Sequence, residues 1–198
     1  MNLTDRRVRR TQKSLGDALI ALALEKDFDE ITIQEITDRA DIGYRTFFRH
    51  YADKDELLND VLSVVKLEMR DLMSPPPLQF FTDPNLQVDD LPNTQILFEH
   101  VQENSNLYRV LLFSNRGLVQ PLKEFAVQEF KAHYGAFLET DIPFEIITDH
   151  MISSIITLLR WWLNNDMCYS PKEMGDIANR LIIQPIRSLI LDGHKQIH

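Results

Sequence analysis

The stretch that decides the fold is Ile31–Leu58, ITIQEITDRADIGYRTFFRHYADKDELL. Thr32 and Glu35 have the spacing of a capping box, in which a hydroxyl and a carboxylate bind the first free N–H groups of a helix, so a short helix is predicted there. Gly43 is expected to shape the turn that follows, because glycine reaches backbone conformations closed to most residues. A second short helix is predicted from Tyr44 to about His50.

A longer helix is predicted immediately afterwards, where Asp53 and Glu56 repeat the capping-box spacing. Helices of two turns are not stable alone, because helix nucleation is unfavourable. The two short helices must therefore pack with the first helix of the chain, predicted from about Asp5 to Glu25. The expected shared core consists of Leu15, Ala18, Leu19, Leu22, Ala23, Phe28, Ile31, Ile36, Ile42, Phe47 and Tyr51. A helix, a tight turn and a second helix in this arrangement form a helix-turn-helix.

The rest of the chain is also predicted to be helical. After Met73 the segment SPPPLQFFTDPNLQVDDLPN holds five of the nine prolines and is interpreted as a linker or irregular loop. Apolar periodicity then predicts helices at Thr94–Glu103, Ser105–Phe113, Gly117–Leu138, Phe144–Asn165 and Pro171–Leu191. The predicted fold is all-α, with a three-helix domain over residues 1–53 and a larger helical domain over residues 54–198 that begins with a linker helix.

The distribution of charge separates the two halves of the chain. The net charge is −9, yet residues 1–54 contain ten Lys and Arg against ten Asp and Glu, so the whole negative excess follows Lys54. Arg6, Arg7, Arg9 and Arg10 lie close together near the start, where they could meet phosphate.

The composition also indicates where the protein is located and how its cysteine behaves. No run of about eighteen uncharged apolar residues occurs, and the N-terminus lacks an apolar signal region. We therefore expect a cytoplasmic protein without a membrane segment. Cys168 is the single cysteine, which excludes an internal disulfide, and we expect a buried structural thiol.

The second short helix carries side chains suited to the DNA major groove, where each base pair shows its own pattern of donors and acceptors. Arg45 could bind guanine with two hydrogen bonds, Thr46 could meet a phosphate or a thymine methyl, and Tyr44 could do either. Gln34 on the preceding helix is another candidate base reader. Contacts to phosphate, which fix the register without reading sequence, are expected from Thr32, His50, Lys54, Arg6 and Arg9.

From Asp5 to Leu58 the chain resembles the tetracycline-repressor (TetR-like) family of bacterial transcription regulators, through ITIQEIT, DIGYRTFFRHY and KDELL. The resemblance implies a homodimeric DNA-binding regulator, expected to be a repressor that a small-molecule effector releases from a palindromic operator. It assigns the following residues to the DNA-facing surface: Thr32, Gln34, Gly43, Tyr44, Arg45, Thr46, Phe48, His50 and Lys54. Two residues depart from the family pattern, since Phe48 replaces the usual tyrosine and Gly43 the usual serine or threonine cap.

The resemblance also suggests roles for the C-terminal half. A dimer interface is expected on the last two helices, at Ile155, Leu159, Trp162, Ile182, Ile186 and Leu189, although the same spacing fits an intramolecular core. An effector pocket is implied among the aromatic residues, with Phe98, Tyr108, Phe113, Phe130 and Tyr134 as candidates, and these too could be plain core.

Three alternatives stay open at this point. The protein could be an activator of the same family, or a helical interaction module that does not bind DNA. An enzyme is disfavoured, because no nucleotide-binding glycine loop, G-x-S-x-G or H-E-x-x-H motif occurs. Glu99, His100 and Glu103 share a predicted helix but form a poor metal-ligand set, so no metal or cofactor is expected.

Overall fold

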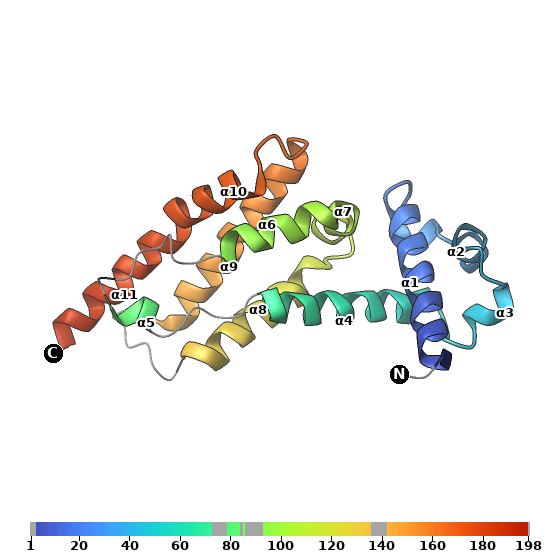
Figure 1. Ribbon diagram of the computed structural model, residues 1–198, viewed down its shortest axis with the longest axis horizontal. Helices are drawn as coiled ribbons and strands as arrows, with labels where there is room; N and C mark the ends of the chain where they lie inside the picture. The colour runs from blue at the N-terminus through green and yellow to red at the C-terminus, as the bar shows by residue number, and fades with distance from the viewer. Residues whose placement is uncertain (1–2, 73–78, 84, 86–92, 136–141, 198) are drawn as a thin grey trace. The chain divides into compact units, whose positions relative to one another are not determined.

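The computed structural model describes residues 3–72, 79–83, 85, 93–135 and 142–197 (Figure 1). Over these residues the regular elements are helices and none is a strand, which confirms the all-α prediction. The chain divides into two compact units. Unit 1 comprises Met1–Leu67 and Asn106–Ser114, and unit 2 comprises Glu68–Ser105 and Asn115–His198. Unit 1 thus extends past the boundary predicted at Lys54.

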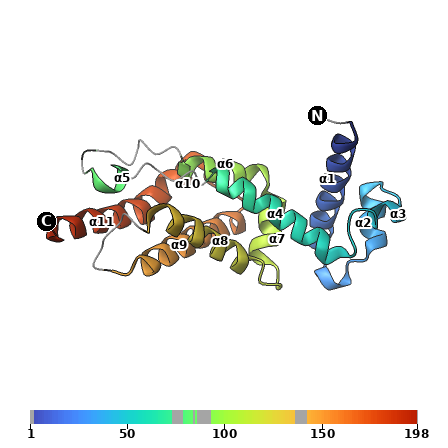
Figure 2. The same ribbon diagram turned by 90° about the horizontal axis from the view of Figure 1, so that it is seen from below.

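Unit 1 is a small helical bundle built around the N-terminal helix. Its elements are α1 (Leu3–Ala23), the 3₁₀ turn η1 (Phe28–Glu30), α2 (Ile33–Ala40), α3 (Tyr44–Phe47), most of α4 (Lys54–Leu72) and most of α7 (Ser105–Phe113). Figure 2 shows α1 beside α2, with α3 following α2 through a tight turn. The predicted core is buried at Leu15, Leu19, Phe28, Ile31, Ile36, Phe47 and Tyr51, whereas Ala23 and Ile42 are half-buried.

Local capping signals explain where the short helices begin. The Thr32 hydroxyl accepts a hydrogen bond from the Glu35 N–H at 3.2 Å, and the Glu35 carboxylate accepts one from the Thr32 N–H at 2.9 Å, so the predicted capping box is present. At α4 only half of the second box forms. Asp53 accepts from the Glu56 N–H at 2.8 Å, but the Glu56 carboxylate binds the Ala52 N–H at 2.6 Å.

The turn between α2 and α3 differs from the expectation for Gly43. Gly43 has an ordinary extended backbone, with φ −61° and ψ 135°. Asp41, at the end of α2, instead takes the left-handed conformation with φ 55°. The turn is closed by the Ile42 N–H, which donates to the Thr37 carbonyl at 3.0 Å. A short polar side chain tolerates this conformation better than most, which explains how the helix ends here without a glycine.

Unit 2 is a larger bundle. It contains the end of α4, α5 (Gln79–Thr82), α6 (Asn93–Glu103), α8 (Val119–Tyr134), α9 (Phe144–Asn164), α10 (Pro171–Ala178), the π-helical turn η3 (Asn179–Ile183) and α11 (Gln184–Ile197). α8 packs along α9, α6 along α10, and α5 against α11 (Figures 1 and 2). The core of this unit includes Phe80, Ala126, Tyr134, Ile147, Met151, Ile152, Ile182, Ile186 and Ile190.

Helix α5 lies within the proline-rich segment interpreted as irregular, and the rest of that segment falls largely outside the described residues. Phe80 is 2% exposed and belongs to the core. Arg187 of α11 donates hydrogen bonds to the carbonyls of Phe80 and Asp83, both at 2.7 Å. Its guanidinium also lies 4.8 Å from the centre of the Phe80 ring. A distant arginine therefore holds this single helical turn in place.

The last predicted helix, Pro171–Leu191, is interrupted by η3. Pro185 has no N–H to donate, and its ring crowds the carbonyl four residues earlier. The backbone widens there, and the Gln184 N–H bonds to the Asn179 carbonyl five residues back. The helix begins with a capping box between Ser170 and Glu173 that the sequence interpretation missed.

Cys168 is exposed, so the prediction of a buried structural thiol is wrong. None of the helices in the described ranges has the length and apolar character needed to cross a membrane.

Candidate nucleic-acid interface

Helix α3 presents one buried side and one exposed side. Phe47 is fully buried and its ring contacts that of Tyr51, with centroids 5.8 Å apart. Tyr44, Arg45 and Phe48 are exposed, and the Tyr44 and Phe48 rings meet edge to face at 5.2 Å. The helix is a single turn, shorter than predicted, and is fixed by its apolar side. Its exposed side carries the side chains expected to read bases.

Tyr51 fixes the end of the α3 segment to α4. Its hydroxyl donates to the Asp60 carboxylate at 2.6 Å. Burial and the nearby carboxylate both raise the pKa of Tyr51 above its ordinary value, so the phenol stays protonated as a donor. Thr46 and His50, two predicted DNA contacts on the same segment, are half-buried.

Gln34 lies exposed on α2, and its amide nitrogen donates to Asp38 one turn along the helix at 2.6 Å. This bond orients the amide and occupies one of its N–H groups. One N–H group and the carbonyl oxygen remain, so Gln34 can both donate to and accept from a base edge.

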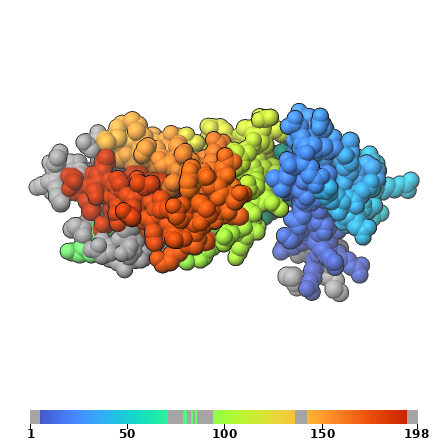
Figure 3. All heavy atoms as spheres, turned by 90° about the horizontal axis from the view of Figure 1, so that it is seen from above, coloured from blue at the N-terminus to red at the C-terminus, as the bar shows by residue number. Residues whose placement is uncertain are grey.

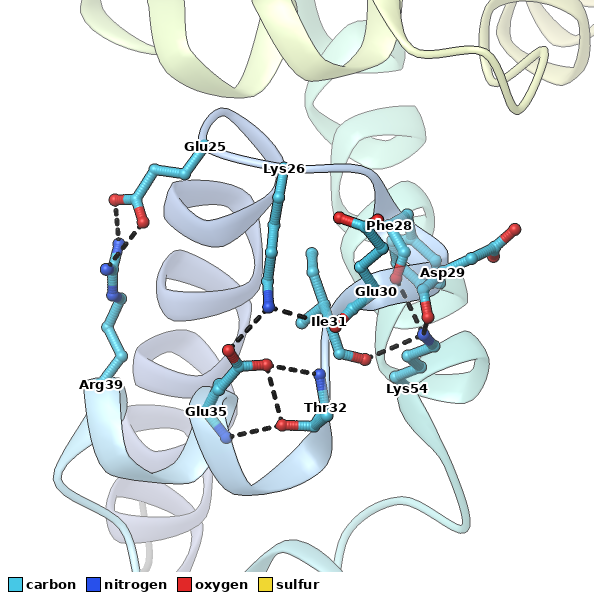
Figure 4. Close-up of polar contacts among 10 residues, drawn as sticks. All are labelled: Glu25, Lys26, Phe28, Asp29, Glu30, Ile31, Thr32, Glu35, Arg39 and Lys54. Carbon is cyan, nitrogen blue, oxygen red and sulfur yellow. Dashed lines mark hydrogen bonds and ion pairs between the residues drawn. The ribbon is translucent and has the colours of Figure 1, made fainter.

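A polar network joins α2 to the segment that precedes it (Figure 4). Lys26 bonds Glu35 at 2.6 Å and the Glu30 carbonyl at 3.1 Å, while Glu35 also accepts from the Thr32 hydroxyl at 2.8 Å. The hydrogen bond from Lys26, with those from Thr32, lowers the pKa of Glu35 from 4.5 to about 2. The Thr32 hydroxyl is therefore engaged within the chain, both as donor and as acceptor.

A second ion pair lies beside the first. Arg39 of α2 binds Glu25 through two parallel hydrogen bonds of 2.6 and 3.0 Å, visible at the left of Figure 4. The paired guanidinium lowers the pKa of Glu25. Two ion pairs thus hold α2 against the segment that follows α1, and the turn to α3 begins at the end of α2.

Lys54, predicted to contact phosphate, is engaged within the protein. Its ammonium donates to the carbonyls of Phe28, Asp29 and Ile31 at 2.8, 3.0 and 2.9 Å, as Figure 4 shows. It also lies 4.9 Å from the centre of the Phe28 ring. An ammonium has three N–H donors, so these carbonyls use its full donor capacity. In this geometry Lys54 ties α4 to the end of η1.

The predicted arginine cluster is part of helix α1. Arg6, Arg7, Arg9 and Arg10 are all exposed on its first turns. Lys13, one turn further, lies 3.7 Å from Asp17. A folded helix holds this positive charge at fixed spacing, as a sequence-independent contact to phosphate requires.

The residues predicted for a dimer interface are largely used inside the chain. Leu159, Trp162, Ile182 and Ile186 are buried, while Ile155 and Leu189 are half-buried against the core of unit 2. Sequence reasoning missed the exposed large side chains on the same elements, Trp161 and Leu181, which are 46% and 66% exposed. Helical spacing located the apolar positions but did not separate inward from outward ones.

The predicted effector residues are distributed between the two units. Tyr108 and Phe113 belong to unit 1, where Tyr108 is buried and Phe113 exposed. In unit 2 Phe98 is fully buried, with its ring edge to face with Trp162 at 5.4 Å. The remaining two lie together. Phe130 contacts Tyr134 at 4.6 Å, and it stacks at 6.1 Å on Phe144, which sequence reasoning did not single out.

Two of the three weak metal-ligand candidates make other contacts. Glu99 accepts a hydrogen bond from Gln95 at 2.7 Å, and His100 lies 3.7 Å from Glu68. Within the described part of the chain, no group of three His, Cys, Asp or Glu residues is arranged to hold a metal ion.

Two family models match the chain. Residues 15–61 match the model of bacterial regulatory proteins of the tetR family, and residues 91–184 match a transcriptional regulator C-terminal region. The first match ends three residues after the stretch Ile31–Leu58 and begins after the arginine cluster of α1.

Individual proteins agree with these matches. A Haemophilus influenzae protein described as an uncharacterized HTH-type transcriptional regulator is 28% identical over 88% of this chain and 86% of its own length. A TetR transcriptional regulator from Streptococcus agalactiae shares the fold with a TM-score of 0.62, at 20% identity over 91% of this chain and 97% of its own. The dihydroxyacetone kinase operon activator DhaS also shares the fold, with a TM-score of 0.57, at 15% identity over 90% of this chain and 97% of its own.

Proposed function

Because the chain belongs to the TetR family of DNA-binding transcriptional regulators, we propose that it acts as a homodimer which represses transcription at a palindromic operator until a small-molecule effector releases it. The observation that carries the DNA-binding part is the geometry of α3. Phe47 fixes the helix by its buried side, and Arg45 and Tyr44 are left exposed on the other. Such a regulator works at the chromosome, hence in the cytoplasm.

The exposed side chains divide into two groups by chemistry. Arg45 and Gln34 carry the hydrogen-bonding groups that read base edges. Arg6 and Arg9, on the first turns of α1, supply charge to phosphate. Thr32 and Lys54 are engaged inside the chain, so we assign them to holding the reading unit together rather than to direct phosphate contact.

Titration with duplexes selected from a random pool, at rising salt, tests DNA binding. Neutralising phosphates releases counterions, so log Kd should change linearly with log salt, with a slope near 0.9 per phosphate contacted. Arg6→Ala with Arg9→Ala should reduce that slope and leave sequence preference unchanged. Binding that is insensitive to salt would favour the alternative of a helical interaction module without DNA binding.

The dimer is proposed because one reading helix buries too little surface for specific binding, and helix-turn-helix proteins solve this with two half-sites one turn of DNA apart. Figure 3 shows atoms of α10 and α11, in orange and red, uncovered on one face of unit 2. Along η3 and α11 the exposed positions Leu181, Pro185 and Ser188 recur at helical spacing and are uncharged. Exposed Arg180 and Asp192 lie at the two ends of this uncharged row, and uncharged positions with charges at their margin are typical of an interface centre and its rim.

Analytical ultracentrifugation tests this interface. Leu181→Asp should convert a dimer to a monomer that is still folded by circular dichroism, because Leu181 is exposed and contributes little to the core of the single chain. Gln128→Asp, an equally new charge on the exposed side of α8, is the matched control and should remain dimeric. A Leu181→Asp protein that still sediments as a dimer would exclude this face.

An effector-binding role is proposed for the aromatic group of Phe130, Tyr134 and Phe144 in unit 2. Aromatic side chains with a phenol among them suit a small, largely apolar ligand. Arg70 supports a coupling route, because it joins the end of α4 to Glu129 of α8 through bonds of 3.1 and 3.0 Å. An effector that moves α8 would bias α4, and by linkage DNA would weaken effector binding by the same factor.

A library of small molecules added to the protein and its selected duplex tests effector release. Compounds that raise Kd for DNA in the wild type should lose that effect in Phe130→Ala. DhaS, which has a similar fold, is described as an operon activator. Whether this chain represses or activates transcription therefore needs a separate test. A reporter gene behind the selected duplex, with and without the protein, separates repression from activation.

A further inference from the structure

Tyr44 and Phe48 form an exposed aromatic pair on the reading segment. They lie one helical turn apart, are 47% and 48% exposed, and their rings meet at 66° with centroids 5.2 Å apart. Phe48 also contacts the ring of Phe47, at 5.4 Å and 74°, and Phe47 is fully buried. The exposed pair therefore packs on the core through the contact between Phe48 and Phe47, which limits the movement of its rings.

The surroundings of the pair are positively charged. Arg45 and Arg49 follow the two aromatic residues directly and are likewise exposed one turn apart. The pairs Tyr44–Arg45 and Phe48–Arg49, four residues apart, therefore give the segment two adjacent exposed stripes, one aromatic and one cationic. The cationic stripe matches the phosphate backbone, and the apolar stripe needs an apolar partner in the same groove.

The chemistry of Phe48 limits what that partner can be. A phenyl ring has no hydrogen-bond donor or acceptor, so it cannot read the polar edge of a base or bind a phosphate oxygen. The apolar group that a base displays in the major groove is the 5-methyl of thymine. We propose that the Tyr44 and Phe48 pair is a specificity determinant that reads thymine methyl groups in each operator half-site. This inference rests on the DNA-binding function proposed above.

Removing one thymine methyl group at a time from the DNA tests this inference. Each thymine of a duplex selected by the full-length protein is replaced in turn by deoxyuridine, which lacks only the methyl group, and Kd is measured by fluorescence anisotropy. Burying one methyl is worth about a fourfold change in Kd. We expect a loss of about that size at one or two thymines of each half-site.

Protein variants then locate the contact. In Phe48→Ala and in Tyr44→Ala the difference in Kd between thymine and deoxyuridine should disappear at one or both of those positions, while Phe48→Tyr should retain it. Leu24→Ala removes another exposed apolar side chain of unit 1 and should leave the difference intact. Circular dichroism spectra that superpose on the wild type will show that the variants are folded, as expected for exposed positions.

The outcomes separate this inference from the function on which it rests. If a duplex is bound but no thymine responds to loss of its methyl, the aromatic pair does not read methyl groups, and DNA binding still stands. The same holds if the response persists unchanged in both Phe48→Ala and Tyr44→Ala, since a residue outside the pair would then make the contact. If no duplex is bound at all, both the proposed function and this inference are overturned.

Discussion

Replacing Lys54 by methionine should destabilise the protein without removing a DNA contact. Methionine keeps an apolar stem beside Phe28 but loses the three hydrogen bonds to the carbonyls of Phe28, Asp29 and Ile31. Hydrogen bonds from a charged donor contribute about 1.5–3 kcal/mol each when buried. Lys54 is only half-buried, and the freed carbonyls can bind water. We therefore expect a loss of about 2–3 kcal/mol in the free energy of unfolding.

Urea denaturation followed by circular dichroism measures that loss. For a slope of about 2 kcal/mol per molar urea, the midpoint should fall by roughly 1–1.5 M. Lys13→Met is the matched control, because the Lys13 side chain is 80% exposed and makes only a surface ion pair with Asp17. Its free energy of unfolding should stay within about 0.5 kcal/mol of the wild type, which is a shift in midpoint of at most roughly 0.25 M.

DNA binding by folded Lys54→Met protein completes the test. If Lys54 is a structural anchor, the salt dependence of Kd is unchanged from the wild type. If it contacts phosphate, the slope of log Kd against log salt falls by about 0.9 and the midpoint in urea hardly moves. An unchanged midpoint together with a reduced slope would therefore refute the anchoring role inferred from the three carbonyl contacts.

Three further substitutions have defined outcomes. Arg45→Ala should weaken binding to the selected duplex by about 1–3 kcal/mol and leave binding to random duplex nearly unchanged, which competition anisotropy can measure. The pKa of Glu35 is lowered in the folded protein to about 2, so its contribution to stability is full above pH 4.5 and is lost as the pH falls toward 2. Glu35→Gln lacks that contribution, and the gap in urea midpoint between it and the wild type should be widest near neutral pH and close on acidification; a constant gap would contradict this. Gly175→Ala would place a Cβ 3.0 Å from the backbone nitrogen of Gln95, so it should lower the thermal midpoint despite alanine's higher helix propensity, and a raised midpoint would show that α6 yields easily.

The parts of the fold that depend on local chemistry were predictable from the sequence. The capping box of Thr32 and Glu35 needs residues three apart, and the bounds of Ser105–Phe113 follow from a short run of periodic apolar residues. Helix α5 was not predictable, since the burial of Phe80 depends on Arg187, which follows it by 107 positions. No pattern within the proline-rich segment contains that partner.

The candidate site was predictable in position more than in role. Tyr44 and Arg45 are exposed as their spacing around Phe47 indicates. The partners of Lys54 are backbone carbonyls. Every residue carries a carbonyl, so the residue types in the sequence do not indicate which ones Lys54 binds. Trp161 and Trp162 are adjacent and equally apolar, yet one is 46% exposed and the other fully buried, because helix phase and not composition decides which faces inward.

The π-helical turn at Asn179–Ile183 makes the C-terminal segment tolerant of one particular change in its length. The turn accommodates one residue more than a regular helix would, so a chain one residue shorter at this point keeps nearly the same helix phase downstream. Ile186 and Ile190 would then stay on the core side. Removing one residue from the middle of the regular helix α9 would instead rotate everything beyond it by about 100° and turn buried residues such as Trp162 toward solvent, so that deletion should be far more damaging.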